Sequence, residues 1–154
     1  MVDKEPIPIA STLAEFNLQW EQLMLQWPEI FYYRYGGRKE YAIKLWGIQC
    51  DLGWCALLSR FLVELDAEAR RLGVPPPRIS QIKEKLGSLR IRFITPKRQA
   101  DIPTELRALV LKYGAESMTT CEVCGDRGRL NESGYRTTRC EAHQPSPQIA
   151  TPYK

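Results

Sequence analysis

Two Cys-x-x pairs near the end of the chain constrain its fold more than any other feature. The first is Cys121-Glu-Val-Cys124, followed directly by Gly125, and the second is Cys140-Glu-Ala-His143. Each spacing lets a tight turn aim both side chains at one point, and three thiolates with one imidazole are the tetrahedral ligand set that zinc prefers. Two disulfides, or free thiols beside an unrelated histidine, are the alternatives. The spacing favours a structural Zn²⁺ ion held by four protein ligands, with no position left open for catalysis.

The length of the chain means that a metal need not hold the whole core together. Its 154 residues are enough to bury a hydrophobic interior. No basic stretch followed by an apolar run opens the sequence, and no apolar stretch approaches the roughly 18 residues that span a bilayer. We therefore expect a cytoplasmic protein without a membrane partner. In that compartment Cys50 and Cys55 are expected to be reduced thiols, and the total of five cysteines is odd.

Three segments show the three-four spacing of amphipathic helices. The first opens at Thr12, whose spacing to Glu15 is that of a capping box, and stops at Pro28. The second begins at Asp51 and ends at Gly73, and the third begins at Asp101. The positions expected to face the core are Leu13, Phe16, Trp20, Leu23 and Trp27 in the first helix, Cys55, Leu58, Leu62, Leu65, Ala69 and Leu72 in the second, and Leu106, Leu109, Val110 and Tyr113 in the third.

Two further segments are predicted to form β-structure. Residues 31–49 are rich in aromatic side chains around a central Gly-Gly pair, which favours two short strands joined at Gly36 and Gly37. Residues 88–95 alternate apolar and basic side chains, which predicts a strand with one apolar and one mainly basic face. Residues 80–87 fit either a short helix closed by Gly87 or the first arm of a hairpin that turns there, and the hairpin is favoured.

Together these elements predict an α+β protein. Two to three amphipathic helices pack on a small antiparallel sheet, and a zinc-ribbon-like appendage follows at the C-terminal end. The expected organisation is an extended arm over residues 1–10, a core domain over 11–117, the metal-binding segment over 118–144 and a disordered tail over 145–154.

Three motifs of the sequence resemble a known type of protein. They are Gln81-Ile-Lys-Glu-Lys-Leu-Gly-Ser-Leu-Arg90, the Gly53-Trp54 pair before a helix, and the C-terminal CEVCG and CEAH segments. Together they resemble small single-domain bacterial and phage proteins that share the pattern QIKEKxGxLR, then CxxCG and Cys-x-x-His. The resemblance covers residues 45–143, and it implies the same architecture and a zinc site without implying an activity. In compactness such a protein is similar in character to immunity proteins, which neutralise a toxin.

The residues argue against catalysis. His143 is the only histidine, so a metal site that uses it leaves no histidine as a general base or triad member. The deaminase signature, H-x-E followed by P-C-x-x-C, is missing from the sequence. A cysteine nucleophile would need a base that the sequence does not supply. We therefore predict that the protein is not an enzyme.

Charge is distributed unevenly, although the net charge is only +4. Residues 1–33 carry one lysine against five acids, whereas residues 78–98 carry seven basic side chains against Glu84 alone. Such polarity favours rapid, oriented association with an oppositely charged partner. The metal-binding segment is charge-balanced, which disfavours a phosphate-tracking zinc ribbon. We predict a module that binds another protein, a toxin or effector, as an immunity, antitoxin or regulatory protein does. Nucleic acid contacted through residues 78–98 is the second choice.

Two surfaces are candidates for the partner contact. Tyrosine, tryptophan and arginine are enriched at interface hot spots, and the aromatic segment supplies several of them. A half-buried sheet face is the alternative for that segment. The residues predicted to contact a partner are Tyr32, Tyr35, Arg38, Tyr41 and Trp46 in the aromatic segment and Lys83, Lys85, Arg90 and Arg92 on the basic strand face.

Overall fold

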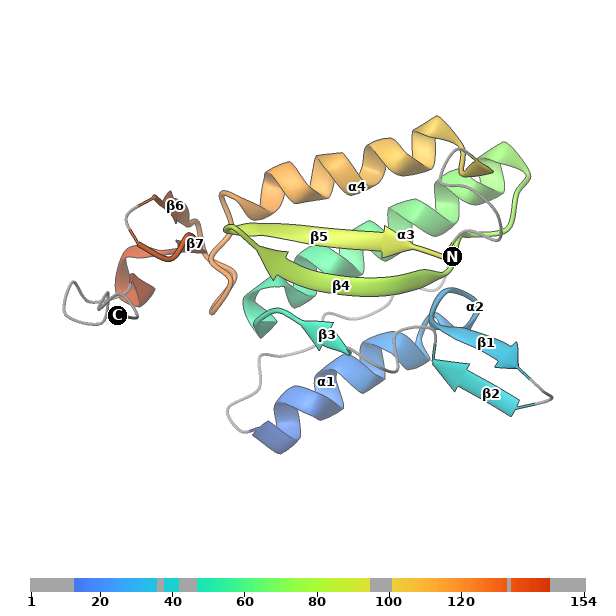
Figure 1. The fold of residues 1–154 in the computed structure, drawn as a ribbon, viewed down its shortest axis with the longest axis horizontal. Helices are drawn as coiled ribbons and strands as arrows, with labels where there is room; N and C mark the ends of the chain where they lie inside the picture. Colours follow the sequence, from blue (N-terminus) through green and yellow to red (C-terminus); the bar gives the residue numbers. More distant parts are fainter. Residues whose placement is uncertain (1–12, 36–37, 42–46, 95–100, 133, 145–154) are drawn as a thin grey trace.

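The fold is seen in a computed structural model, which describes residues 13–35, 38–41, 47–94, 101–132 and 134–144 (Figure 1). The extended arm and the tail that we predict lie outside these ranges. The elements in chain order are α1 Leu13–Leu25, α2 Pro28–Phe31, β1 Tyr32–Tyr35, β2 Arg38–Tyr41, β3 Ile48–Gln49, the 3-10 turn η1 Leu52–Trp54, α3 Cys55–Leu72, β4 Ile79–Lys85, β5 Ser88–Phe93, α4 Thr104–Ser117, β6 Arg129–Asn131, β7 Thr137–Arg139 and the 3-10 turn η3 Glu141–His143.

A three-stranded sheet in the order β3-β4-β5 lies at the centre of the chain. β4 and β5 pair antiparallel, whereas β3 runs parallel to β4 with Ile48 opposite Ile82. The α+β class is confirmed. The central sheet is mixed, which differs from the antiparallel sheet that we predicted, because the two residues of β3 are too few to show a periodicity.

The hairpin between β4 and β5 turns tightly over two residues. Lys85 lies opposite Ser88, and the residues between them, Leu86 and Gly87, have φ angles of 55° and 79°. Two consecutive positive φ angles are those of a type I′ turn, whose twist matches the twist of the paired strands. The hairpin favoured for residues 80–87 is therefore confirmed.

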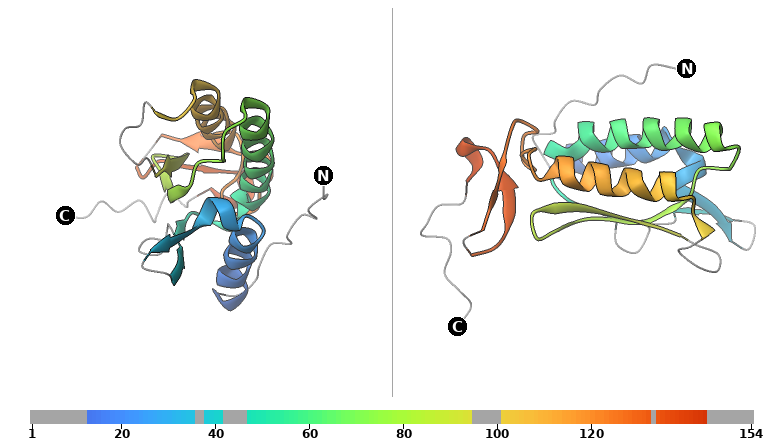
Figure 2. Two further views of the ribbon diagram at one scale, coloured as in Figure 1. Left: turned by 90° about the vertical axis from the view of Figure 1, so that its right-hand side faces the viewer. Right: turned by 90° about the horizontal axis from the view of Figure 1, so that it is seen from above.

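The hydrophobic core lies between this sheet and two long helices. α3 and α4 cover the same side of β4 and β5, as the right-hand view of Figure 2 shows. The side chains of Leu13 and Phe16 lie outside the described part of the chain, and Leu72 and Val110 are partly buried. All the other positions predicted to face the core are buried: Trp20, Leu23, Trp27, Cys55, Leu58, Leu62, Leu65, Ala69, Leu106, Leu109 and Tyr113.

One polar cluster joins the two long helices. The ammonium of Lys112 lies 2.8 Å from a carboxylate oxygen of Glu64, and the hydroxyl of Tyr113 donates to the other oxygen over 2.6 Å. These hydrogen bonds, the one from Lys112 foremost, lower the pKa of the Glu64 carboxyl. The ring of Tyr113 meets that of Phe61 edge to face, with centroids 5.5 Å apart. A charged contact and an aromatic contact thus fix α4 on α3.

The first helix and the aromatic segment differ slightly from the prediction. α1 ends at Leu25, before the predicted stop at Pro28, and Pro28 instead begins the one-turn helix α2, where a proline at the first position costs no hydrogen bond. α2 buries Ile30 and Phe31 completely. β1 and β2 then form the predicted pair of short antiparallel strands. Within the described ranges, every helix falls short of the length and apolar character that a bilayer crossing requires.

Candidate metal centre

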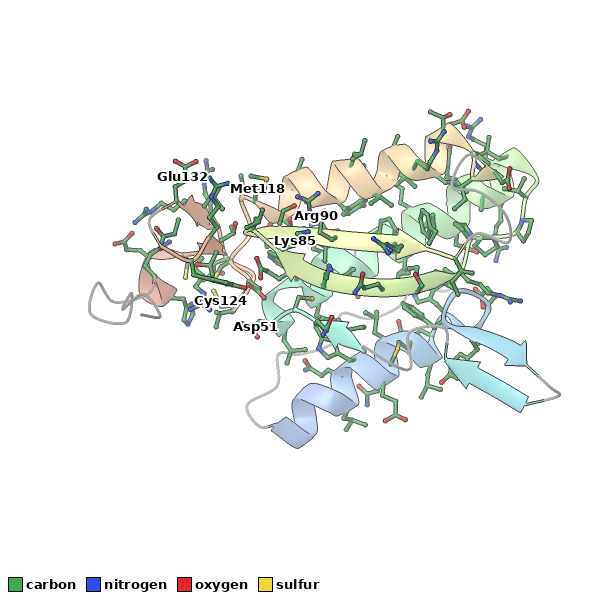
Figure 3. All side chains as sticks on the ribbon, viewed as in Figure 1. Asp51, Lys85, Arg90, Met118, Cys124 and Glu132 are labelled. Atoms are coloured by element: carbon green, nitrogen blue, oxygen red, sulfur yellow. The ribbon has the colours of Figure 1, made fainter. Side chains whose placement is uncertain are left out.

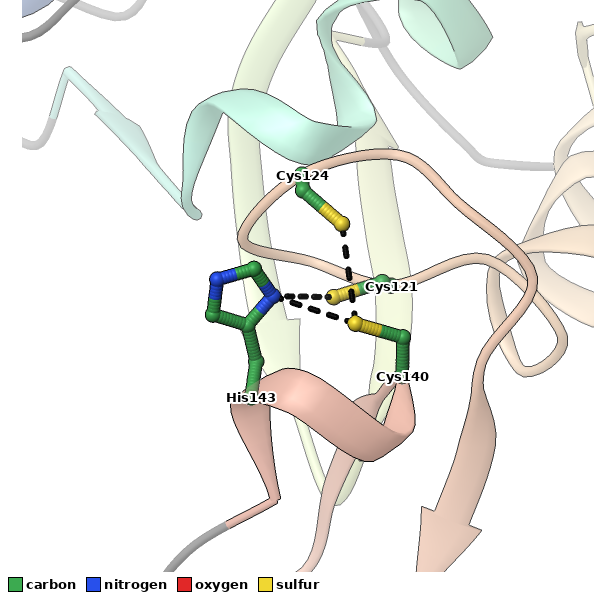
Figure 4. A group of neighbouring side chains, drawn as sticks. All are labelled: Cys121, Cys124, Cys140 and His143. Atoms are coloured by element: carbon green, nitrogen blue, oxygen red, sulfur yellow. Dashed lines mark hydrogen bonds between the residues drawn. The ribbon is translucent and has the colours of Figure 1, made fainter.

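The four predicted ligands meet at one point at the end of the molecule. Their ligand atoms all lie within 4.8 Å of one another (Figure 4). The Nδ1 atom of His143 lies 3.1 Å from the Sγ atom of Cys140 and 3.7 Å from that of Cys121, and the Sγ atoms of Cys124 and Cys140 are 3.7 Å apart. This group can hold a metal ion.

Local structure explains why the two Cys-x-x pairs converge. After α4 the chain turns back at Gly125, whose φ is 82° and whose backbone N–H donates to the carbonyl oxygen of Cys121 over 2.8 Å. The short hairpin of β6 and β7 then returns the chain to Cys140. There the one-turn η3, closed by the N–H of His143 donating to the carbonyl of Cys140, brings the imidazole to the thiols.

The pKa values of two of the thiols indicate that a nearby positive charge would be favourable. Burial raises the pKa of Cys121, but backbone N–H groups of Cys140, Cys124 and Val123 lower it further, to about 6. Burial raises the pKa of Cys124 to about 12. The side-chain hydrogen bonds with Cys121 and Cys140 and the charge of Cys121 add to the rise, whereas the backbone N–H of Asp126 acts in the opposite direction. One thiolate is therefore favourable on its own, whereas a second beside it is not. A bound cation removes this conflict because it stabilises every thiolate of the set.

The segment around the centre, residues 118–144, is anchored on the start of α3. The backbone N–H of Gly53 donates to the carbonyl of Glu122 over 2.7 Å, and the indole N–H of Trp54 donates to the carbonyl of Thr120 over 2.9 Å. A Cβ atom at Gly53 would overlap the carbonyl oxygens of Cys121 and Glu122. Only a glycine lets the backbone of the core approach a metal-ligand residue this closely.

One buried carboxylate completes this anchor. Glu122 is buried, and one of its carboxylate oxygens accepts a hydrogen bond from the backbone N–H of Asp51 over 3.0 Å. Burial raises the pKa of the Glu122 carboxyl to about 7, although the Asp51 donor acts in the opposite direction. The contact between residues 51–54 and residues 120–122 is the joint between the core and the metal-binding segment. Figure 3 labels Asp51 and Cys124, which lie on its two sides.

A second anchor lies at the tip of the β4–β5 hairpin. The hydroxyl of Thr138 donates to the carbonyl of Gly87 over 2.6 Å, and a Cβ atom at Gly87 would overlap the Cδ1 atom of Leu130. Neither anchor was predicted from the sequence. The sequence does contain the residues concerned, because Gly53 and Trp54 form one of the motifs that resemble the small bacterial and phage proteins, and Gly87 lies in another.

The structure brings the predicted basic residues together. Lys83 lies opposite Arg90, and Gln81 lies opposite Arg92, so that these side chains share one face with Lys85. A hollow of about 460 Å³ lies over this face, which we call the basic face and define by Lys83, Lys85, Arg90 and Arg92. Among the described residues, none of these four side chains forms an ion pair. Figure 3 labels Lys85 and Arg90 on the hairpin.

The aromatic candidates are placed only in part. Tyr32 is half-buried and packs against the core, which agrees with the half-buried alternative at this one position. The β1–β2 register sets Tyr32 opposite Tyr41 and Tyr35 opposite Arg38. The side chains of Tyr35, Arg38 and Tyr41 lie outside the described part of the chain, as does the whole of Trp46.

Among the described residues, the four predicted ligands are the one group of side chains that could hold a metal ion. All four predicted ligands converge, and they use the only histidine in the sequence. Comparison of the chain with protein-family models, with curated proteins and with solved structures gives no match. The interpretation therefore comes from the residues themselves.

Proposed function

We propose that Cys121, Cys124, Cys140 and His143 hold one structural Zn²⁺ ion. Two thiolates about 2.3 Å from a tetrahedral zinc ion stand roughly 3.8 Å apart, and a thiolate and an imidazole nitrogen stand roughly 3.6 Å apart. Two of the contacts in the group, Cys124–Cys140 and Cys121–His143, measure 3.7 Å. The donors are thiolates and an imidazole, which zinc prefers over oxygen ligands. When bound, zinc would neutralise the thiolates and cross-link the two Cys-x-x pairs.

The position of the centre supports a structural role. Cys121 is fully buried, and its neighbours Thr120 and Glu122 accept hydrogen bonds from the start of α3. A closed, four-ligand set packed against the core holds a segment in place rather than exposing a reactive ion. We infer that the protein is not an enzyme and that it acts through its surface.

The observation that carries the functional proposal is the basic face. Four cations lie side by side on a rigid hairpin, and like charges opposite each other on a sheet destabilise it. Such a surface is complementary to an acidic one, which would remove that repulsion on binding. We therefore propose a non-catalytic, zinc-stabilised module that binds an acidic partner protein. In biological terms, an immunity, antitoxin or regulatory protein that neutralises or modulates its partner fits this description.

A nucleic acid is the second candidate because phosphates also attract a row of lysine and arginine. The metal-binding segment argues against it. There Arg127, Arg129, Arg136 and Arg139 are matched by Glu122, Asp126, Glu132 and Glu141. A surface that follows a phosphate backbone is expected to be basic over a longer span.

Purification of the tagged protein from its native host tests the partner class. The sample is treated with nuclease and compared with an Arg90→Glu, Arg92→Glu variant. We expect one stoichiometric polypeptide that survives the nuclease and is lost from the variant. Recovery of nucleic acid alone would contradict the proposal.

Exchange of zinc for cobalt tests the closed centre separately. We expect the absorption spectrum of tetrahedral cobalt thiolate, unchanged by added small anions, because no ligand position is open. A spectrum that shifts with azide would indicate an exchangeable position and argue for a catalytic ion.

A further inference from the structure

We propose that the exposed edge of β5 is the docking site, and that an extended segment of the partner adds there as a further strand. This inference rests on the proposed function, and it names the contact and the chemistry of the partner. The segment alternates acidic and apolar side chains. Strand addition uses main-chain hydrogen bonds for affinity and alternate side chains for specificity.

The backbone of β5 shows which of its groups face the edge. In the described part of the chain β5 has a strand neighbour on one side only, β4. The N–H of Ile94 points toward that side, where it donates to the carbonyl of Arg78 over 2.7 Å. The N–H of Leu89 points the other way and donates to the hydroxyl of Ser117 in α4 over 2.8 Å. Because strand N–H groups alternate in direction, those of Ile91 and Phe93 face the same edge as that of Leu89.

α4 closes this edge at Leu89 but leaves it open farther along. A hollow of about 370 Å³ lies between β5 and α4 beyond that point. Leu111 of α4 borders it with 75% of its surface exposed. The hollow is lined by Ile91, Arg92, Phe93, Arg107, Val110 and Leu111. An added strand would pair with the open part of β5 and cover exposed apolar surface of α4.

The side chains around the edge define the complementary sequence. Arg90 and Arg92 lie on the basic face, whereas Ile91 between them lies on the face toward α4. A strand paired with β5 would present every second side chain to each of these faces. Carboxylates would meet the arginines, and apolar side chains would meet Ile91 and Leu111. Cross-strand pairs of both kinds stabilise a sheet.

Other occupants fit this edge less well. A second copy paired through β5 would bring Arg90 and Arg92 close to the same residues of its partner, and like charges in such pairs are destabilising. A nucleic acid would contact the basic face, but it has no strand edge to pair with the N–H groups of Ile91 and Phe93. An acidic strand-forming segment uses the charge, the open edge and the apolar groove together.

Labelled peptides test the inference directly. The probe is a fluorescein-labelled peptide of alternating glutamate and valine, about eight residues long, which lies within the usual length of a strand. One copy is N-methylated at its glutamates and another at its valines, so that each copy loses the donors of one strand edge. A third copy has lysine in place of glutamate. Binding to the zinc-loaded full chain is followed by fluorescence anisotropy.

We expect the parent peptide to bind and one methylated copy to lose roughly tenfold in affinity, while the other copy binds like the parent. The lysine peptide is not expected to bind. Arg90→Glu with Arg92→Glu should reduce binding by roughly tenfold or more. The matched control is Arg127→Glu with Arg136→Glu, which makes the same change in net charge at two exposed residues of the metal-binding segment. Its affinity should equal that of the wild type.

Three results would overturn the inference. They are no measurable binding of the parent peptide, equal binding of the two methylated copies, and equal binding of the lysine peptide. Duplex DNA that displaces the peptide at equal concentration would assign the surface to nucleic acid instead. The two proposals can fail separately. If the methylated copies bind alike but a polypeptide still co-purifies from the host, strand addition at β5 is wrong and the proposed binding of a partner protein stands.

Discussion

The backbone N–H of Gly53 donates to the carbonyl oxygen of Glu122 over 2.7 Å, so η1, the turn before α3, is held by the residue next to Cys121, one of the proposed metal ligands. This contact connects the core to the segment that contains the metal centre. We therefore expect the packing of the core and the affinity of the proposed centre for metal to depend on each other.

Gly53→Ala should lower both the stability of the core and the affinity for zinc. The added Cβ would overlap two backbone carbonyl oxygens, and neither can move without moving Cys121. We expect a loss of about 1–3 kcal/mol in the free energy of unfolding, the usual cost of overpacking, together with weaker zinc binding. Urea denaturation and competition with a chromophoric chelator measure the two effects. Gly73→Ala is the control, because a Cβ there has open space and meets only the strain of a left-handed residue. Wild-type zinc affinity in Gly53→Ala would contradict the coupling.

Loss of the metal should unfold residues 118–144 and leave most of the core folded. His143→Ala removes one ligand, whereas the core helices keep their buried apolar faces. We expect the variant to lose its zinc in elemental analysis and to retain most of its far-UV circular dichroism. Chelation of the wild type should give the same spectrum. The control is Cys50→Ala, which removes a buried thiol outside the centre and should keep the metal. Complete loss of the helical signal would show that the core depends on zinc.

Glu64→Gln should make the free energy of unfolding depend less on pH in the acid range. Hydrogen bonds from Lys112 and Tyr113 hold the pKa of Glu64 below its ordinary value of 4.5. The folded state therefore favours the ionised carboxylate. This contribution is fully present above pH 4.5 and is lost as the pH falls through the lowered pKa. Urea denaturation of both proteins between neutral and acid pH measures the effect. All the other titratable groups are common to both proteins, so the difference isolates Glu64. Parallel curves would exclude the contribution.

Arg90→Glu should stabilise the free protein. The substitution places a carboxylate opposite Lys83 where two cations now face each other. An opposite-charge pair across two strands contributes roughly 0.2–1 kcal/mol, and calorimetry would record a higher melting temperature. Arg127→Glu, at an exposed residue outside the basic face, controls for the change in net charge. A lower melting temperature for Arg90→Glu would mean that Arg90 supports the fold.

Periodicity predicted the three longer helices and the strand β5 because each has a repeating apolar face, whereas it left residues 80–87 open between a short helix and the first arm of a hairpin. Spacing alone predicted the four metal ligands, since a tetrahedral ion requires them to converge. What the sequence did not reveal depends on contacts between distant residues. β3 pairs over two residues, and its partner Ile82 lies far along the chain. The anchors at Gly53 and Gly87 are single glycines whose role is visible only beside Glu122 and Leu130.

The open edge of β5 likewise became visible only with the fold. Alternation identifies a basic strand face, but it does not say whether a strand is central or at an edge. Ser117 and Gly114 of α4 contact the start of β5, whereas Leu111, which is 75% exposed, borders a hollow farther along the strand. That arrangement follows from the packing of one helix against one strand, which no local pattern records.

The distance along the chain between the two sides of the joint also has a consequence for synthesis. Asp51 and Glu122 are 71 positions apart, and the ribosome makes the earlier residue first. At roughly 5–20 residues per second, Glu122 is synthesised on the order of 4–14 s after Asp51. A metal held by Cys121 and its three neighbours could be loaded only after the described helices have been made. Until the ribosome reaches Thr120, Trp54, which is fully buried in the folded protein, lacks the carbonyl to which its indole N–H donates.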